Sequence, residues 1–318
     1  MNYLFSINRR LFRLWAVCAA FWLMLCLTLC PAQASSVRFG QIQADRDATY
    51  LDLGSETVTN WAEFYDFLEQ LPALRQVDLF ATEIRKDRIE EMTSRFPEIT
   101  FGMTMLVGDH VLRTDAAAFS TLHTPKSPKH GDDELSLVRY CVNLYALDLG
   151  HNRLSDLSFL EELPELRILI VAMNNVEDLT PVGSLSHLEY LEIFNNNITD
   201  ISCLANLKYL TDVSLVNNRI ADISPLASAG NLRRLWMRGF NRTLPAADVS
   251  EAAEMLRTEL PLCEVDDRSF GVGGTWREHP HYDVIRRIFQ TGVYEPFEDS
   301  PEENRPKLMD PLHLYMND

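Results

Sequence analysis

The chain has 318 residues, of which 46% are hydrophobic and 24% are charged, so it carries enough apolar material for a large core and lacks the composition of a disordered protein. Acidic residues outnumber basic ones by 46 to 29, which gives a formal charge of −17. Such a surface repels phosphate backbones and anionic lipid headgroups, so we expect neither nucleic acid nor a membrane surface as a ligand.

The first 34 residues have the pattern of a secretory signal peptide. A basic stretch over 8–13 precedes an apolar run over 14–30, and small residues at 32 and 34 suit a signal peptidase. The apolar run is short for the roughly 30 Å hydrocarbon layer of a bilayer. We therefore expect export to the medium or the cell envelope and no membrane insertion after cleavage, with an uncleaved anchor as the alternative.

Three cysteines remain beyond the leader, at positions 141, 203 and 263. An odd and widely spaced set describes no disulfide framework, and it contains no pair at the spacing of a zinc site. We expect free, partly buried thiols, no cofactor, and stability that comes from packing.

Residues 143–230 divide into four consecutive units of 22 residues without insertions. Apolar residues recur at the second, fifth, seventh, twelfth, fifteenth and eighteenth places of each unit, and asparagine recurs at the tenth. The asparagine amide offers both a donor and an acceptor to backbone groups that a turn leaves unpaired, so we predict a structural role. These ladder asparagines are Asn152, Asn174, Asn196 and Asn218.

Each unit is predicted to contain a strand and a short outer helix. A Leu-x-Leu alternation has the period of a strand, and stacked units make a parallel sheet. At the sixteenth place Ser158, Thr180, Ser202 and Ser224 are positioned to cap a helical turn, which predicts 3₁₀ or short helices on the outer side. The aspartates at the fourteenth place are interpreted as turn residues rather than calcium ligands.

The four units match the pattern LxxLxLxxNxIxDIxxLxxL almost throughout, and they resemble the 22-residue leucine-rich repeats of bacterial internalins. The resemblance implies an α/β solenoid with a curved parallel sheet on its concave side, 3₁₀ or short helices on its convex side, and helical terminal caps. It also implies a concave side that binds another protein, and it implies no chemistry.

The pattern loosens on both sides of the regular block. Upstream, helices over 61–71 and 87–96 follow short apolar strands, and alternating residues over 99–114 predict a hairpin or a strand extension. The expected organisation is a signal peptide over 1–34, degenerate strand-helix repeats over 35–115, a repeat array over 116–242, a carboxy-terminal cap over 243–294 and a flexible acidic tail over 295–318.

The repeat register fixes which strand residues face outward on the concave side. Many of these are apolar or aromatic, so we predict a contiguous exposed patch that anchors a protein partner. The alternative is that the carboxy-terminal segment folds back and covers the patch. The predicted binding residues are Ile168, Ile170, Tyr190, Glu192, Phe194, Asp212, Val216, Arg234, Trp236 and Arg238.

The densest cluster of possible metal ligands or acid-base groups is Glu278, His279, His281 and Asp283. Proline between the histidines prevents helical spacing, and no third ligand is evident elsewhere, so we predict no metal and no catalytic residue. The sequence thus predicts an exported, monomeric, non-enzymatic protein that binds an unidentified protein partner. A glycan or cell-wall binder is the first alternative, and a hydrolase with a site near His279 and His281 is the second.

Overall fold

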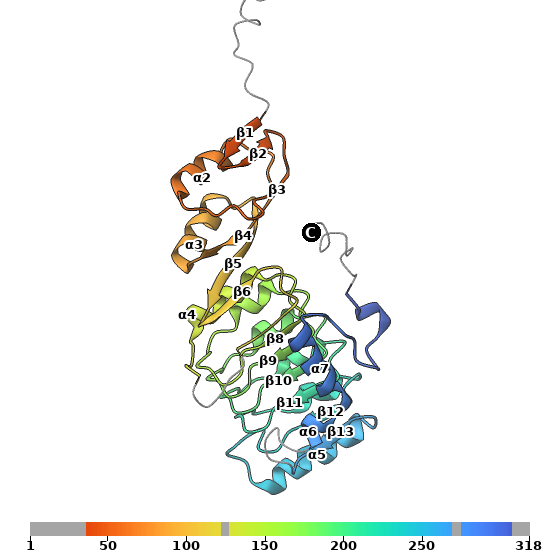
Figure 1. Cartoon of the computed structure of the whole chain (residues 1–318). Helices are drawn as coiled ribbons and strands as arrows, with labels where there is room; N and C mark the ends of the chain where they lie inside the picture. The colour runs from red at the N-terminus through yellow and green to blue at the C-terminus, as the bar shows by residue number, and fades with distance from the viewer. Residues whose placement is uncertain (1–35, 122–126, 269–274, 307–318) are drawn as a thin grey trace, which may run out of the picture.

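The computed structural model describes residues 36–121, 127–268 and 275–306, so the proposed leader lies outside the described residues. A four-stranded sheet near the amino-terminal end and the seven-stranded sheet of the repeat array follow one another along the molecule (Figure 1). The strands are β1 (Ser36–Phe39), β2 (Ile42–Asp45), β3 (Tyr50–Asp52), β4 (Gln76–Ile84), β5 (Thr100–Val107), β6 (His110–Arg113), β7 (Ala118–Ser120), β8 (Ala146–Asp148), β9 (Ile168–Ile170), β10 (Tyr190–Glu192), β11 (Asp212–Ser214), β12 (Arg234–Trp236) and β13 (Glu264–Asp266).

The helices lie between and after these strands. The α-helices are α2 (Trp61–Leu68), α3 (Lys86–Arg95), α4 (Asp132–Leu135), α5 (Ala246–Glu259), α6 (Thr275–Glu278) and α7 (Pro280–Thr291). The 3₁₀ helices are η1 (Ser136–Tyr140), η2 (Ser158–Glu162), η3 (Thr180–Ser184), η4 (Ser202–Asn206), η5 (Ser224–Ser228) and η6 (Glu302–Asn304). None of the helices in these described ranges combines the length and the apolar character that a membrane span requires.

The amino-terminal unit is a four-stranded sheet in the order β3-β4-β5-β6, preceded by the β1-β2 hairpin. The first three strands are parallel, and β6 pairs antiparallel with β5, which confirms the hairpin expected over 99–114. One side of the sheet is apolar because alternate residues such as Val77, Leu79 and Met103 point to it, and these side chains are buried with the apolar faces of α2 and α3. The opposite side of this sheet carries mostly polar and aromatic residues.

The repeat array forms a seven-stranded parallel sheet in which β7 to β13 pair in chain order. Equivalent places of successive units lie in register, so Leu147, Leu169, Leu191, Val213 and Leu235 form one row across five strands. All five are fully buried, and the 3₁₀ helices η1 to η5 stack on the outer side. The parallel sheet and the outer 3₁₀ helices of a leucine-rich repeat solenoid are therefore confirmed.

The ladder asparagines satisfy backbone groups between neighbouring coils. Asn174 donates through Nδ2 to the carbonyls of Leu149 at 2.9 Å and Val171 at 3.1 Å, and its Oδ1 accepts the amide N–H of Leu154 at 2.9 Å. Asn196 and Asn218 repeat this pattern one and two coils further on. Each of these amides therefore bridges two coils, which is the arrangement that the predicted structural role requires.

The expected caps of the outer helices are wrong in one detail. The serines and threonine of the sixteenth place make no capping bond, because each is already the first residue of its 3₁₀ helix. Instead the aspartate two residues earlier accepts the backbone N–H, as Asp178 does from Thr180 at 2.8 Å and Asp222 does from Ser224 at 2.8 Å. Aspartate favours this local turn because its carboxylate reaches the amide two residues on.

The part of the chain that follows the array divides into two pieces that lie in different places. Helix α5 and strand β13 close the open end of the solenoid, where β13 pairs with β12. Residues 275–306, which include α6, α7 and η6 and which we call the C-terminal segment, turn back and lie along the inner, concave side of the sheet (Figure 1). The flexible tail expected over 295–318 is therefore wrong for 295–306, which pack on the array, and 307–318 lie outside the described residues.

Candidate functional site: the inner face of the solenoid

The inner face of the repeat array is covered by the C-terminal segment. Apolar side chains of β8 to β12 and of the loops that follow these strands form one buried cluster with Trp276, Ile285, Ile288 and Phe297. Ile285 and Ile288 are one helical turn apart, so they share the face of α7 that rests on the sheet. The cover is a helix with one apolar side, and it removes the apolar inner face from water.

Trp276 is the central contact of this cover. Its indole N–H donates to Glu192 Oε1 at 2.8 Å, and its ring lies 5.6 Å from Tyr190 and 5.2 Å from Trp236 between centroids. The guanidinium of Arg234 lies over the same ring at 4.4 Å. Burial raises the pKa of Glu192, while the hydrogen bonds from Tyr190 and Trp276 act in the opposite direction. An aromatic anchor with a satisfied polar atom in a dry pocket has the character of an interface hot spot.

His281 joins the segment to the sheet by charge. Its Nδ1 lies 2.9 Å from Asp212 Oδ2 and its Nε2 lies 3.1 Å from Asp299 Oδ1, while the ring stacks on Phe297 with centroids 4.3 Å apart. Burial favours the neutral ring, but the two carboxylates outweigh it and raise the pKa of His281 to about 9. His281 is therefore a buried cation at neutral pH, and both of its nitrogens are occupied.

Beyond α7 the segment returns along the edge where the strands begin. Asn304 donates to the carbonyl of His187 at 3.0 Å and accepts on its own carbonyl from Arg167 Nε at 2.9 Å. The Arg167 side chain is 2% exposed, and its guanidinium lies 5.4 Å from the ring centroids of both Tyr145 and Tyr294. These contacts explain why 295–306 are held in place despite their acidic, proline-containing sequence.

The predicted binding residues lie on one surface, as the register required, but that surface is not exposed. Nine of the ten are buried, at 7% exposure or less, and Arg238 is half-buried. The expected exposed patch is wrong, and the alternative that the C-terminal segment covers it describes the structure. The nine buried residues are Ile168, Ile170, Tyr190, Glu192, Phe194, Asp212, Val216, Arg234 and Trp236.

The histidine cluster has a third possible ligand that the sequence did not indicate. Asp212 lies on β11, and one donor atom each from Asp212, His279 and His281 fall within 4.8 Å of one another. However, the guanidinium of Arg234 forms an ion pair with the same carboxylate, and both nitrogens of His281 already contact carboxylates. A divalent cation would therefore meet a fixed positive charge and a histidine whose nitrogens are taken, so these residues do not fit a metal.

Glu278 and Asp283, the other members of that cluster, point to solvent at the ends of α6 and α7. Sequence reasoning also missed three residues in a stretch that has no apolar periodicity. Asp299 pairs with His281, and Ser300 and Asn304 bond to Glu189 just before β10. A usable signal did exist: an apolar strand face in a monomer needs a cover, and Ile285 with Ile288 supplies the apolar helix face that can provide it.

Comparison with known proteins agrees with the repeat pattern. A family model described as leucine-rich repeats in two copies matches residues 164–208 and 186–228. No curated protein matches the chain by sequence.

Several solved structures are similar to the chain. An internalin, InlF, from Listeria monocytogenes is 22% identical with a TM-score of 0.33, over 69% of this chain and 55% of that one. Internalin C2 from the same organism is 25% identical with a TM-score of 0.31, over 53% and 64% of the two chains. A leucine-rich repeat protein from Leptospira interrogans is 21% identical with a TM-score of 0.39, over 63% and 50%. The chain thus spans about half to two thirds of the length of these proteins.

The 22-residue units, the asparagine ladder and the parallel sheet together define a leucine-rich repeat fold. This fold is that of a protein-interaction module, and in this molecule the inner face of the regular array is occupied by the chain's own C-terminal segment.

Proposed function

We propose that this chain is an exported, non-enzymatic interaction module that binds a protein partner while the inner face of its regular array stays closed. The observation that carries the proposal is the closure itself. The C-terminal segment buries Trp276, satisfies its indole N–H on Glu192, and pairs His281 with Asp212. Buried ion pairs and aromatic anchors of this kind are costly to separate, so the segment is part of the folded core and not a ligand awaiting exchange.

The closed array therefore serves as a rigid support. The partner binds a surface other than the covered inner face of β8 to β12, which the repeat register had indicated as the binding site. The histidine cluster favours the non-enzymatic interpretation, because His281 is buried and engaged on both nitrogens and thus serves as a structural cation. The proposal of export depends on the composition of residues 1–34, whose basic start and apolar run suit a secretory leader.

The test is affinity capture with the folded mature chain, followed by reconstitution with the purified captured protein and measurement of its Kd. Specific binding of a protein that survives removal of its glycans supports the proposal. Binding that persists after protease treatment of the ligand supports a glycan or cell-wall ligand in its place and overturns the proposal. Cell fractionation followed by amino-terminal sequencing tests the export step, since protein found only in the cytoplasm with an intact leader would contradict it.

A further inference from the structure

The two sheets of this solenoid differ in whether their inner side is covered. On β8 to β12 the side chains that point to the inner side are almost all buried under the C-terminal segment. On β3 to β6 the corresponding side chains are exposed or half-buried, and no element in the described part of the chain lies over them (Figure 1). We call this surface the open inner face, and its main side chains are Tyr50, Asp52, Gln76, Asp78, Phe80, Thr104, Leu106, Val111 and Arg113.

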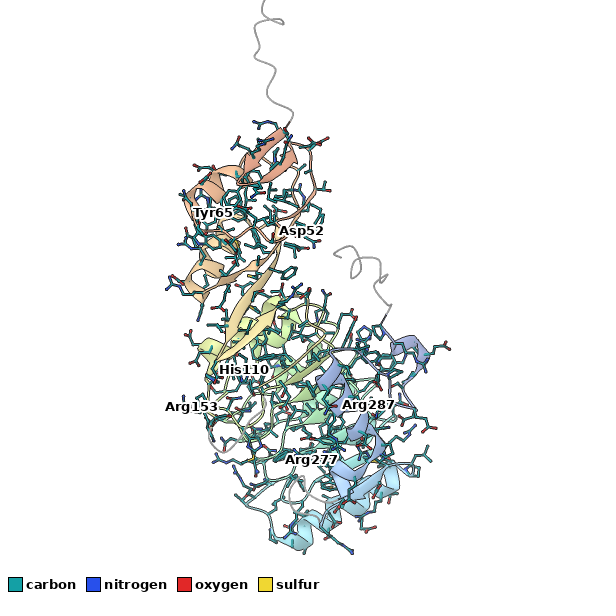
Figure 2. All side chains as sticks on the ribbon, in the orientation of Figure 1. Asp52, Tyr65, His110, Arg153, Arg277 and Arg287 are labelled. Carbon is teal, nitrogen blue, oxygen red and sulfur yellow. The ribbon has the colours of Figure 1, made fainter. Side chains whose placement is uncertain are left out.

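The open inner face exposes large apolar side chains on an ordered sheet. Tyr50 is 50% exposed, and Leu106 and Val111, which pair across the β5-β6 hairpin, are 39% and 63% exposed. Figure 2 shows Asp52 on the same side of the molecule as Arg287 of α7, with Tyr65 and Arg153 on the opposite side. The open inner face therefore continues the concave side at the point where its internal cover ends.

The carboxylates of this face are held in position. Asp78 accepts from Tyr50 Oη at 2.9 Å and from Gln76 Nε2 at 3.2 Å, and neither donor carries a charge. Asp52 accepts the backbone N–H of Gly54 at 2.7 Å and is otherwise directed to solvent. Among the residues that the structure describes, none forms a direct ion pair with either of these two carboxylates, which lie beside the half-exposed Tyr50 ring.

The same face already accommodates one guanidinium of the chain itself. Arg113 stacks over the Phe80 ring at 3.9 Å and pairs with Asp115 at 2.6 Å. The hydrogen bond to Asp115 raises the pKa of Arg113, and the nearby charges of Asp78 and Asp52 add to this effect. Three carboxylates against one guanidinium leave a net negative face, and stacking of Arg113 on Phe80 shows how a further cation can rest on an aromatic ring here.

Gly102 leaves the centre of the open inner face without a side chain that projects from the sheet. A Cβ atom at this position would lie 2.3 Å from Asp78 Oδ1 and 2.7 Å from Phe80 Cζ, so a larger residue would displace both side chains. Because the strand carries no side chain here, Asp78 and Phe80 lie across it and form a shallow floor. An extended chain can approach such a floor along its length.

We propose that the open inner face binds an extended, lysine- or arginine-rich segment of a protein partner, whose cations pair with Asp52 and Asp78 and whose aliphatic stems lie on the half-exposed Tyr50 ring. This inference rests on the proposed protein-binding function and names the surface and the chemistry of the partner. Charge complementarity supports it, because the face is acidic and the chain as a whole carries −17.

The test is fluorescence anisotropy with a capped, labelled peptide of alternating lysine and glycine and the folded mature chain. The double variant Asp52→Asn/Asp78→Asn keeps the size of both residues and one of the two acceptor oxygens of each, so it should fold normally. We expect its Kd to rise roughly three- to tenfold. The matched control Glu161→Gln/Glu162→Gln removes two exposed charges from the outer side and should bind like the wild type.

Tyrosine 50 provides a test that leaves the net charge unchanged. Tyr50→Ala should weaken the peptide several-fold, and Tyr50→Phe should restore most of the affinity because the ring remains. The inference is overturned if the wild type does not bind the basic peptide, if the control pair weakens it as much as the Asp52/Asp78 pair, or if neutral glycan fragments bind this face instead. A captured protein partner that binds the Asp52/Asp78 variant unchanged overturns this inference alone and leaves the proposed function standing.

Discussion

Trp276 donates its indole N–H to Glu192 across a separation of 84 residues in sequence, and both side chains are fully buried. Glu192 occupies a strand position on the inner side of the array, and the groups that bond to it belong to the same chain. Its carboxylate accepts from Trp276 and from Tyr190. The closure of the inner face is therefore a specific packing arrangement with its own hydrogen bonds, and several of its consequences can be measured.

Replacing Trp276 with alanine should reduce the free energy of unfolding by about 3 to 5 kcal/mol, because it leaves a cavity among Tyr190 and Trp236 and deprives Glu192 of a donor. Urea denaturation followed by circular dichroism measures the change. Arg286→Ala is the control, since Arg286 lies on the outer side of α7 and its side chain is 58% exposed. The control should change stability by no more than about 0.5 kcal/mol. Equal stabilities for the two variants would contradict the docking of the C-terminal segment.

The raised pKa of His281 predicts that the protein loses stability in alkaline solution. Its pKa is about 9 in the folded protein, against an ordinary value of 6.5. Because the folded pKa is the higher one, the contribution of His281 is complete below pH 6.5 and is lost as the pH rises through 9. The loss should be roughly 2 to 3 kcal/mol. His281→Gln, which does not titrate in this range, should show a flatter stability profile than the wild type between pH 6.5 and 9. Parallel profiles for the two proteins would rule out the charged pairing with Asp212 and Asp299.

The asparagine ladder can be tested with two neighbouring residues. Asn174 bridges two coils and is 7% exposed, whereas the Asn175 side chain is exposed. Asn174→Ala should lower the free energy of unfolding by about 2 to 4 kcal/mol, because several buried backbone groups lose their partner at once. Asn175→Ala should have an effect within about 0.5 kcal/mol. Thermal or chemical unfolding of both variants measures the difference. If Asn174→Ala left the free energy of unfolding unchanged, the structural role of the ladder would be contradicted.

The packing of residues 295–306 can be tested in the same manner. Asn304 is fully buried and bonds to His187 and Arg167, while the next residue, Arg305, is exposed. Asn304→Ala should destabilise the protein by about 1 to 3 kcal/mol and should raise the rate of amide hydrogen exchange at the end of the segment. Arg305→Ala should leave both quantities close to the wild type. Fast exchange throughout 295–306 in the unmodified protein would show that the segment is not held.

The sequence predicted the repeat architecture because its determinants are local. Leu169 and Leu191 are buried in neighbouring strands since their places in the unit have the period of a strand, and no distant residue alters that alternation. The same reasoning located the ladder asparagines and the outer 3₁₀ helices. The hairpin of β5 and β6 also followed from alternation around a glycine-containing turn.

The exposure of the candidate site could not be predicted in this way. Register shows which side chains share a face, but it does not show what lies on that face. His281 meets Asp212 only after the chain has turned back along the sheet, and Asp299 then pairs with the other ring nitrogen of His281. The hydrogen bonds of Asn304 likewise cannot be predicted from the local sequence, because an acidic and proline-containing stretch has the composition of a mobile tail.

The sequence by itself thus determined the coil of the solenoid, since a repeated spacing of buried side chains acts between immediate neighbours along the chain. Only the tertiary structure decided which inner surface remains open to water, because that depends on contacts such as Trp276 with Glu192 between segments far apart in sequence. The free energy of covering an apolar sheet face comes from long-range packing, which no local pattern encodes.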